Sequence, residues 1–165
     1  MIARQPRRSL APSASLIVMG ANDLAHCLSG WHVRETDKRN GVCYRWTGAE
    51  AEFRIFVEQG SRALSLMVSG AATLTGQPVP LSLYSGGRRL VHLREAAPAD
   101  NWTIAELPLD PSHYGEQIYT LRVETLRGTE SPGSRGVAQL FVPDLYLHNG
   151  DFRELGIMVA SIRAA

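Results

Sequence analysis

The feature of this sequence that most restricts its fold is how often a turn interrupts it. Short runs in which apolar and polar residues alternate are separated by Gly, Pro, Asn or Asp at intervals of roughly ten residues. Alternation places the apolar side chains of a strand on one face. The clearest runs are 53–57, 64–68, 79–83 and 118–123. This spacing predicts an all-β chain: a single antiparallel β-sandwich, jelly-roll-like, of about nine or ten short strands.

Length and composition indicate one domain. The chain has 165 residues, of which 44% are hydrophobic and 20% charged, values typical of a globular protein with a single core. We expect a flexible leader over 1–14 and one β-sandwich domain over 15–165. The leader is basic, but the apolar run after it is short and follows Pro12, so we expect a cytoplasmic protein, with export as the alternative.

Charge and cysteine content argue against several classes of partner. The net charge of +1 offers no electrostatic basis for binding nucleic acid, and the sequence contains no run of about 18 apolar residues that could insert into a membrane. The two cysteines, Cys27 and Cys43, lack metal-ligand spacing and are expected to be free thiols. The sequence therefore predicts no metal site and no cofactor.

The segment 31–46 has the pattern of a β-hairpin. Trp31 and Val33 alternate with polar residues, and Tyr44 and Trp46 do so after the dipeptide Asn40-Gly41. Asn-Gly is the strongest signal for a two-residue hairpin turn, in which both residues adopt positive φ. We therefore expect Asn40 and Gly41 to form the turn.

No pattern marks a catalytic residue. A G-x-S-x-G elbow and an H-E-x-x-H motif are both missing from the sequence. Catalytic groups can also assemble from distant positions, so a small carbohydrate-active hydrolase or lyase stays open as an alternative. The tryptophans offer a different chemistry, because a flat aromatic ring packs against the apolar C–H face of a sugar.

Three segments together resemble a known family. They are Gly30-Trp31-His32-Val33-Arg34-Glu35, then Tyr44-Arg45-Trp46-Thr47, and finally Asp151-Phe152-Arg153-Glu154-Leu155-Gly156-Ile157. In this order they are similar to a β-sandwich module of bacterial polysaccharide-biosynthesis proteins, which occurs beside glycosyltransferases. The resemblance implies a non-catalytic module of surface-polysaccharide biosynthesis that binds carbohydrate or a glycosyltransferase-type partner protein.

The same segments contain the candidate site. In an antiparallel sandwich the first and last strands often lie side by side, so the charged residues of the three segments could form one network beside two tryptophans. Arg153 would be held by Asp151 or, across the sheet, by Glu35. The network could line a carbohydrate site, or it could brace the chain ends of a structural domain without glycan affinity. The candidate residues are Trp31, Glu35, Arg45, Trp46, Asp151 and Arg153.

Overall fold

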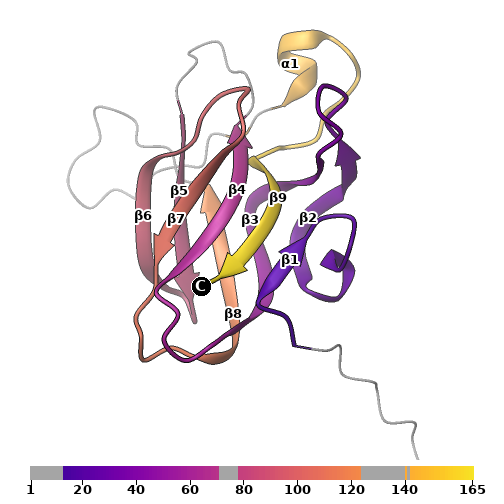
Figure 1. Ribbon diagram of the computed structural model, residues 1–165. Coiled ribbons are helices and arrows are strands. Elements are labelled where there is room, and N and C mark those ends of the chain that lie inside the picture. Colours follow the sequence, from indigo (N-terminus) through magenta and orange to yellow (C-terminus); the bar gives the residue numbers. More distant parts are fainter. Residues whose placement is uncertain (1–12, 71–77, 124–139, 141) are drawn as a thin grey trace, which may run out of the picture.

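The computed structural model describes residues 13–70, 78–123, 140 and 142–165, and within them most of the chain is β-strand, with very little helix (Figure 1). The described residues form nine strands, a 3-10 helix and one short α-helix. In chain order these elements are β1 (Leu16–Val18), η1 (Asp23–Ala25), β2 (Cys27–Thr36), β3 (Cys43–Val57), β4 (Ala63–Gly70), β5 (Val79–Ser85), β6 (Arg88–Ala97), β7 (Thr103–Pro108), β8 (Gly115–Val123), α1 (Pro143–Leu147) and β9 (Ile157–Ala164). The all-β prediction is confirmed. The predicted leader lies almost wholly outside the described residues.

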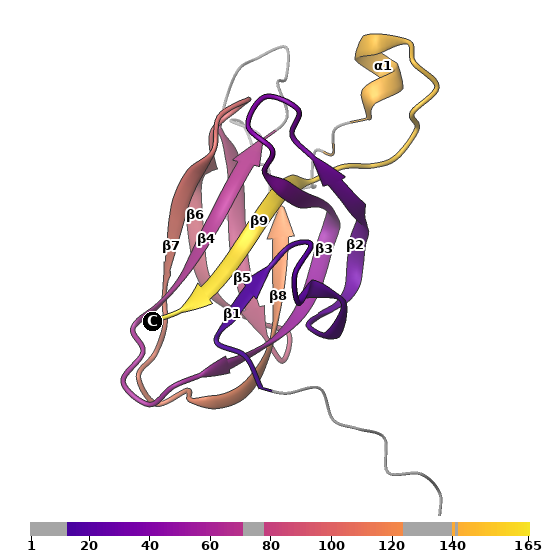
Figure 2. The ribbon, with the colours of Figure 1, turned by 45° about the vertical axis from the view of Figure 1, so that its right-hand side comes forward.

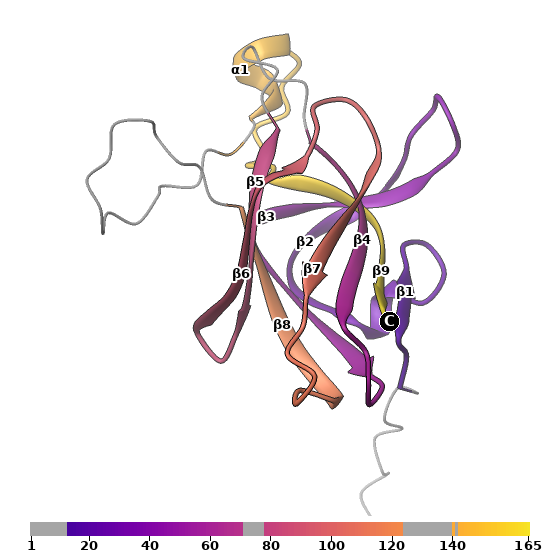
Figure 3. The same ribbon diagram turned by 60° about the vertical axis from the view of Figure 1, so that its left-hand side comes forward.

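The strands form two layers that share the long strand β3. The sheet order is β6-β5-β8-β3-β9-β4-β7, with β1 paired to β9 and β2 paired to β3. The second half of β3, residues 50–57, pairs with β8, whereas Arg45 and Trp46 near its start pair with β9. The sheet bends along β3, so β6, β5 and β8 face β9, β4 and β7 across the interior (Figure 3). The result is the predicted antiparallel β-sandwich.

The core fills the space between the two layers. Along the second half of β3 every other residue is buried, because successive side chains of a strand point to opposite faces. The same alternation holds along β8 and along β4 as far as Val68. The largest fully buried side chains are Tyr119, Phe53, Ile17, Ile55, Leu64, Leu66, Leu81, Leu83, Leu107, Leu121, Leu155 and Ile157.

A β-bulge interrupts the alternation in β9. Its pairing with β4 shifts register between Met67 and Val68, and the neighbouring residues Val159 and Ala160 are both buried. An extra residue on one strand turns the following side chains to the other face. The bulge therefore lets Ile157 and Val159 before it and Ile162 and Ala164 after it face the same core.

The predicted hairpin exists, but its turn differs from the prediction. Thr36 pairs with Cys43, and the N–H of Asp37 donates to the carbonyl of Val42 at 2.8 Å, so the loop contains four residues rather than two. Gly41 has a φ of +74°, whereas Asn40 does not adopt a positive φ. Instead, the side-chain oxygen of Asn40 accepts the N–H of Val42 at 2.9 Å. Four-residue loops are a common alternative to the Asn-Gly turn, and here this side-chain bond closes the loop.

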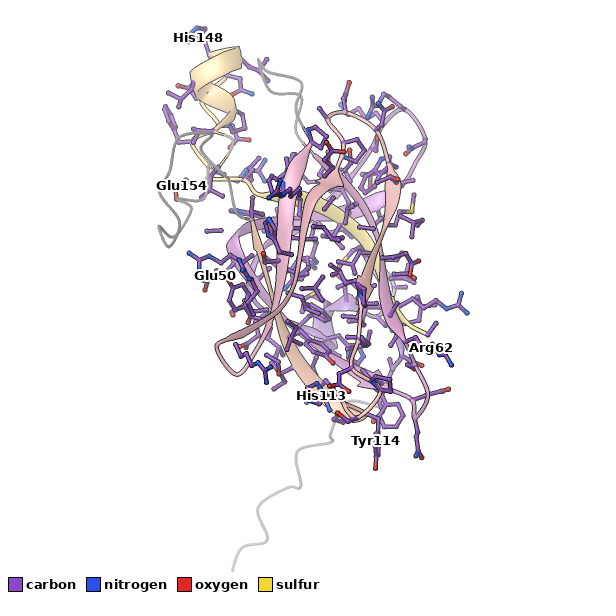
Figure 4. The ribbon with its side chains drawn as sticks, turned by 90° about the vertical axis from the view of Figure 1, so that its left-hand side faces the viewer. Glu50, Arg62, His113, Tyr114, His148 and Glu154 are labelled. Atoms are coloured by element: carbon purple, nitrogen blue, oxygen red, sulfur yellow. The ribbon has the colours of Figure 1, made fainter. Side chains whose placement is uncertain are left out.

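Before β9 the chain makes an excursion that the sequence did not indicate. Helix α1 begins at Pro143, a favoured first helical position, and ends before His148, which adopts a φ of +48°. His148 lies at the outer tip of this excursion (Figure 4). The excursion closes on itself, because the N–H of Asp144 donates to the carbonyl of Asp151 at 2.8 Å.

Candidate functional site

Aromatic and charged side chains gather at one end of the sandwich. They come from β2 and the β2–β3 loop, from the start of β3, from the turn before β7, and from the segment before β9. Figure 2 shows the β2–β3 loop and the segment leading into β9 at this same end. We call this group the end cluster; its members are Glu35, Asp37, Arg39, Tyr44, Trp46, Asp100, Trp102, Asp151 and Arg153.

Arg153 joins the last segment of the chain to the hairpin. Its Nη1 donates to Oε1 of Glu35 at 2.6 Å, while its Nη2 and Nε donate to the two oxygens of Asp151 at 2.8 and 3.0 Å. The structure thus uses both carboxylates that the sequence analysis offered as partners. The exposed fractions of the three side chains are 34% for Arg153, 31% for Glu35 and 25% for Asp151, so water still reaches the network. The hydrogen bonds from Arg153 lower the pKa of Asp151 to about 2.

Three aromatic rings lie in a row beside this network. The ring of Tyr44 lies 5.8 Å from the ring of Trp102 and 6.3 Å from the ring of Trp46, which it meets nearly at a right angle. Trp46 is buried and packs with Leu155, whereas Tyr44 and Trp102 are half-buried. The Tyr44 hydroxyl donates to Glu35 at 3.2 Å. Burial, reinforced by the charge of Glu35, raises the pKa of Tyr44 to about 12.

A second set of ionic contacts joins the hairpin loop to the turn before β7. Nη2 of Arg39 lies 3.2 Å from Asp37, and its Nη1 lies 3.2 Å from Asp100. The indole N–H of Trp102 donates to Asp37 at 3.1 Å. The hydrogen bonds from Arg39 and Trp102 hold the pKa of Asp37 well below its usual range. These contacts orient Trp102 against Tyr44.

Arg45 does not belong to the end cluster, so the prediction of a single network is wrong for this residue. Arg45 lies between Tyr44 and Trp46 on one strand, and alternation turns its side chain to the other face. Its Nε donates to Asp23 at 2.5 Å, and its Nη1 donates to the carbonyl of His32 at 2.9 Å. Asp23 is 4% exposed and also accepts the N–H of Gly20 at 2.9 Å. Burial alone would raise the pKa of Asp23, but these hydrogen bonds lower it below its ordinary value.

Trp31 also lies away from the end cluster. Its indole N–H donates to the carbonyl of Glu52 at 2.8 Å, and its ring packs against the main core. The pairing of β2 with β3 shifts register between Trp31 and Arg34, so side chains before and after this irregularity do not follow one alternation. Of the six predicted site residues, the structure brings together Glu35, Trp46, Asp151 and Arg153.

The end of the Asp151–Ile157 segment has a clear structural role. The N–H of Gly156 donates to the carbonyl of Thr47 at 2.7 Å, and the N–H of Ile157 donates to the Thr47 hydroxyl at 3.1 Å. A Cβ on residue 156 would lie 2.4 Å from Oγ1 of Thr47, closer than any side chain can approach. Leu155 covers Trp46. These contacts fix the segment on β3 and thereby place Arg153.

Sequence reasoning missed several residues of the end cluster. The alternation of Tyr44 with Trp46 was visible, and it was a signal that the two rings share a face. No local pattern places Asp37, Arg39, Asp100 and Trp102 together, because the ionic contacts between two separate loops create this arrangement. Further contacts tie the hairpin to the last segment: a ring nitrogen of His32 lies 3.2 Å from the carbonyl oxygen of Glu154, a residue labelled in Figure 4.

The described residues contain neither a metal-binding cluster nor a membrane-spanning helix. They contain no group of three or more His, Cys, Asp and Glu side chains placed to hold a metal ion. None of the helices in this part of the chain has the length and apolar character needed to cross a membrane.

Comparison with known proteins gives similarity in fold only. No protein-family model matches the sequence, and no curated protein matches it significantly. Among solved structures, a family 35 carbohydrate binding module from an environmental isolate is similar with a TM-score of 0.46 and 10% identity over 91% of each chain. A family 35 carbohydrate binding module from Clostridium thermocellum is similar with a TM-score of 0.42 and 13% identity over 92% of each chain. Similarity at this level says nothing about the ligands of the present chain.

Proposed function

We propose that the end cluster binds carbohydrate and that the domain is a non-catalytic binding module. The observation that carries this proposal is the contact between Tyr44 and Trp102, two half-buried rings whose polar ends are each held by a carboxylate. The apolar C–H faces of a sugar ring pack against such aromatics, and the sugar hydroxyls donate hydrogen bonds to nearby carboxylates. Rings that are already oriented lose little entropy when a ligand binds.

The charge state of the carboxylates supports binding over catalysis. The lowered pKa values of Asp37 and Asp151 keep both groups ionised at neutral pH. An ionised carboxylate is a good acceptor for sugar hydroxyls, but Asp37 already accepts hydrogen bonds from Arg39 and Trp102 at both oxygens, and Asp151 accepts those of Arg153. Each oxygen of Glu35 accepts a single hydrogen bond, from Arg153 or from Tyr44, so about two of its four lone-pair sites stay open to a sugar. A glycosidase instead needs a general acid with a raised pKa. Asp37 and Asp151 are therefore poorly suited to protonate a sugar, and Glu35 is the carboxylate that can accept its hydroxyls.

A matched pair of variants tests the proposal. Trp102→Ala removes the ring beside Tyr44, whereas Ile104→Ala removes an exposed side chain (57%) two residues further along, outside the end cluster. A glycan array identifies a ligand, and titration calorimetry then measures its affinity for each variant. We expect Trp102→Ala to weaken binding about tenfold or more, as expected for the loss of a stacking aromatic, and Ile104→Ala to have no effect. Equal affinity of the two variants, or no glycan bound by the wild-type protein, would contradict the proposal.

A second candidate function is binding of a protein partner without glycan affinity. The excursion before β9 presents three exposed apolar side chains: Leu145 at 69%, Leu147 at 65% and Phe152 at 71%. Exposed apolar side chains close together are typical of interaction surfaces. On the motif resemblance alone, we propose that such a partner is a glycosyltransferase-type enzyme of bacterial surface-polysaccharide biosynthesis. The short apolar run after the basic leader separately supports a location in the cytoplasm.

The two candidate functions predict opposite effects for the same pair of variants. If partner binding is the function, the double variant Leu145→Ser/Phe152→Ser fails to capture a glycosyltransferase that the wild-type protein binds, and Trp102→Ala still captures it. If carbohydrate binding is the function, Trp102→Ala loses glycan affinity and the double variant keeps it.

A further inference from the structure

A small pocket lies on the other face of the β2–β3 hairpin from the end cluster. It has a volume of about 170 Å³ and lies between η1 and the start of β2. Its side walls are Leu24, Cys27, Leu28, Trp31 and Arg45, and the exposed residues Ser29 and Gly30 complete its lining. The two site residues that the end cluster does not use, Trp31 and Arg45, thus meet here.

The walls of this pocket are held in place by the fold. Asp23 fixes Arg45, and the carbonyl of Glu52 fixes the indole N–H of Trp31. Gly30 has a φ of +77°, and a Cβ at this position would lie 1.8 Å from the carbonyl oxygen of Glu50. The backbone at Gly30, which forms part of the lining, therefore lies directly against β3. A pocket with such fixed walls is formed before any ligand arrives.

The chemistry of the pocket points to a neutral ligand. Asp23 already balances the charge of Arg45, so a further anion gains little there. The Nε and Nη1 groups of Arg45 are engaged, whereas its Nη2 makes no hydrogen bond within the described part of the chain. Burial raises the pKa of the free thiol Cys27 to about 12, so this wall stays uncharged. Leu28 and the Trp31 ring are apolar. The pocket therefore combines the Arg45 donor and polar groups at Ser29 and Gly30 with the apolar side chains of Leu28 and Trp31.

We propose that this pocket binds the acetamido group of an N-acetylated sugar, with the methyl against Leu28 and Trp31 and the carbonyl oxygen accepting a hydrogen bond from Nη2 of Arg45. The volume fits a functional group rather than a whole ligand, for which pockets of about 300–1,000 Å³ are usual. The sugar ring would then lie outside, beside Leu24, whose side chain is 85% exposed. The inference rests on the proposed carbohydrate binding only in naming a sugar as the carrier of the acetamido group.

The test begins with the bare functional group. N-methylacetamide is titrated into ¹⁵N-labelled protein, and backbone amide shifts are followed by NMR; methyl N-acetyl-β-glucosaminide, methyl β-glucoside and sodium acetate are titrated in parallel. We expect both amides to shift the signals of residues 24–31, and the glucoside and acetate not to shift them. Leu28→Trp places a larger side chain at the pocket and should weaken amide binding about tenfold or more. Leu16→Trp is the control, because Leu16 has the same 44% exposure and does not line the pocket.

The outcomes separate this inference from the proposed function. No shift at residues 24–31 with either amide, acetate binding at least as strong as amide binding, or unchanged amide binding in Leu28→Trp would each overturn the pocket proposal. Glycan binding that Trp102→Ala abolishes would stand in all three cases. Conversely, amide binding that survives in Trp102→Ala while no glycan binds the end cluster would support the pocket and contradict the proposed function. Arg45 is left intact throughout, because its loss would leave Asp23 buried without a cation.

Discussion

The hairpin β2–β3 carries two arginine–carboxylate centres on its opposite faces, and they differ in their access to water. Arg45 is 14% exposed and its partner Asp23 is 4% exposed, whereas Arg153 is 34% exposed and its partners Glu35 and Asp151 are 31% and 25% exposed. When one member of a buried ion pair is removed, water cannot take its place beside the remaining charge. When one member of a half-exposed pair is removed, water can take its place, and the carboxylates of such a pair keep lone pairs open to solvent. The buried centre therefore stabilises the fold, whereas the carboxylates of the half-exposed centre are open to solvent.

The difference follows from where each arginine lies in the chain. Arg45 is inside a strand, so alternation points it to the face that η1 covers. Arg153 belongs to an irregular segment before β9, which is fixed through Gly156 and Leu155 rather than by regular pairing. The loop members of the end cluster are thus held by side-chain contacts, and loops tolerate substitution better than the interior of a strand does.

The largest expected effect comes from breaking the buried centre. Arg45→Ala leaves the carboxylate of Asp23 buried without its cation, and we expect the free energy of unfolding to fall by about 3–5 kcal/mol. Urea denaturation followed by tryptophan fluorescence measures the loss. A loss no larger than that of Arg153→Ala would contradict the distinction between the two centres.

A double-mutant cycle serves as the control for this variant. Asp23→Ala/Arg45→Ala removes both charges, so the variant no longer has an unpaired buried ion. We expect it to be more stable than Arg45→Ala alone. Additive losses from the two single variants would mean that Arg45 acts through its packing and not through Asp23.

Breaking the exposed centre should cost less. Arg153→Ala removes a bidentate contact to Asp151 and one contact to Glu35, but solvent reaches all three groups, and we expect a loss of about 1–2 kcal/mol. If the end cluster binds carbohydrate, the same variant also weakens glycan binding, since Asp151 and Glu35 lose their orientation. Thermal unfolding with and without an oligosaccharide measures both effects. A loss above about 3 kcal/mol would show that this centre is as essential to the fold as the buried one.

The two centres also show what could be read from the sequence. Alternation predicted the strands and the sandwich, and the spacing of Asp151 and Arg153 predicted their contact. The same rule of alternation places Arg45 on the opposite face from Tyr44 and Trp46. Applied at this position, the rule excludes Arg45 from the predicted single network. The register shifts in β2 and β9 could not be predicted, since nothing in the local composition marks the extra residue. Trp102 reaches the end cluster only through tertiary contacts between two loops.

A substitution in the β2–β3 loop tests the hairpin that carries both centres. Gly41 has a φ of +74° and open space around its Cα, so Gly41→Val strains the backbone without a steric clash elsewhere. A β-branched residue at positive φ is strongly disfavoured, and we expect a loss of about 1 kcal/mol or more. The midpoint of urea denaturation measures it, with Lys38→Val as the control at an exposed loop position without positive φ. An unchanged midpoint for Gly41→Val would mean that the loop adapts and does not constrain the hairpin.

The smallest expected effect is a difference in acid sensitivity. Asp23 and Asp151 both have pKa values in the folded protein below the ordinary value, the latter at about 2. A carboxyl whose pKa is depressed by folding contributes stability that is fully present above its unfolded pKa of about 4 and is lost as the pH falls through its folded pKa. The wild-type protein should therefore lose stability between about pH 4 and pH 2. Arg153→Ala removes the main cause of the shift at Asp151, so its stability should fall less steeply over this interval, while Asp23 and Asp37 still titrate. Urea denaturation of both proteins at a series of pH values compares the two slopes. If Arg153→Ala showed the wild-type slope, Asp151 would gain no stability from its contact with Arg153, and the exposed centre would be left with Glu35 as its only effective partner.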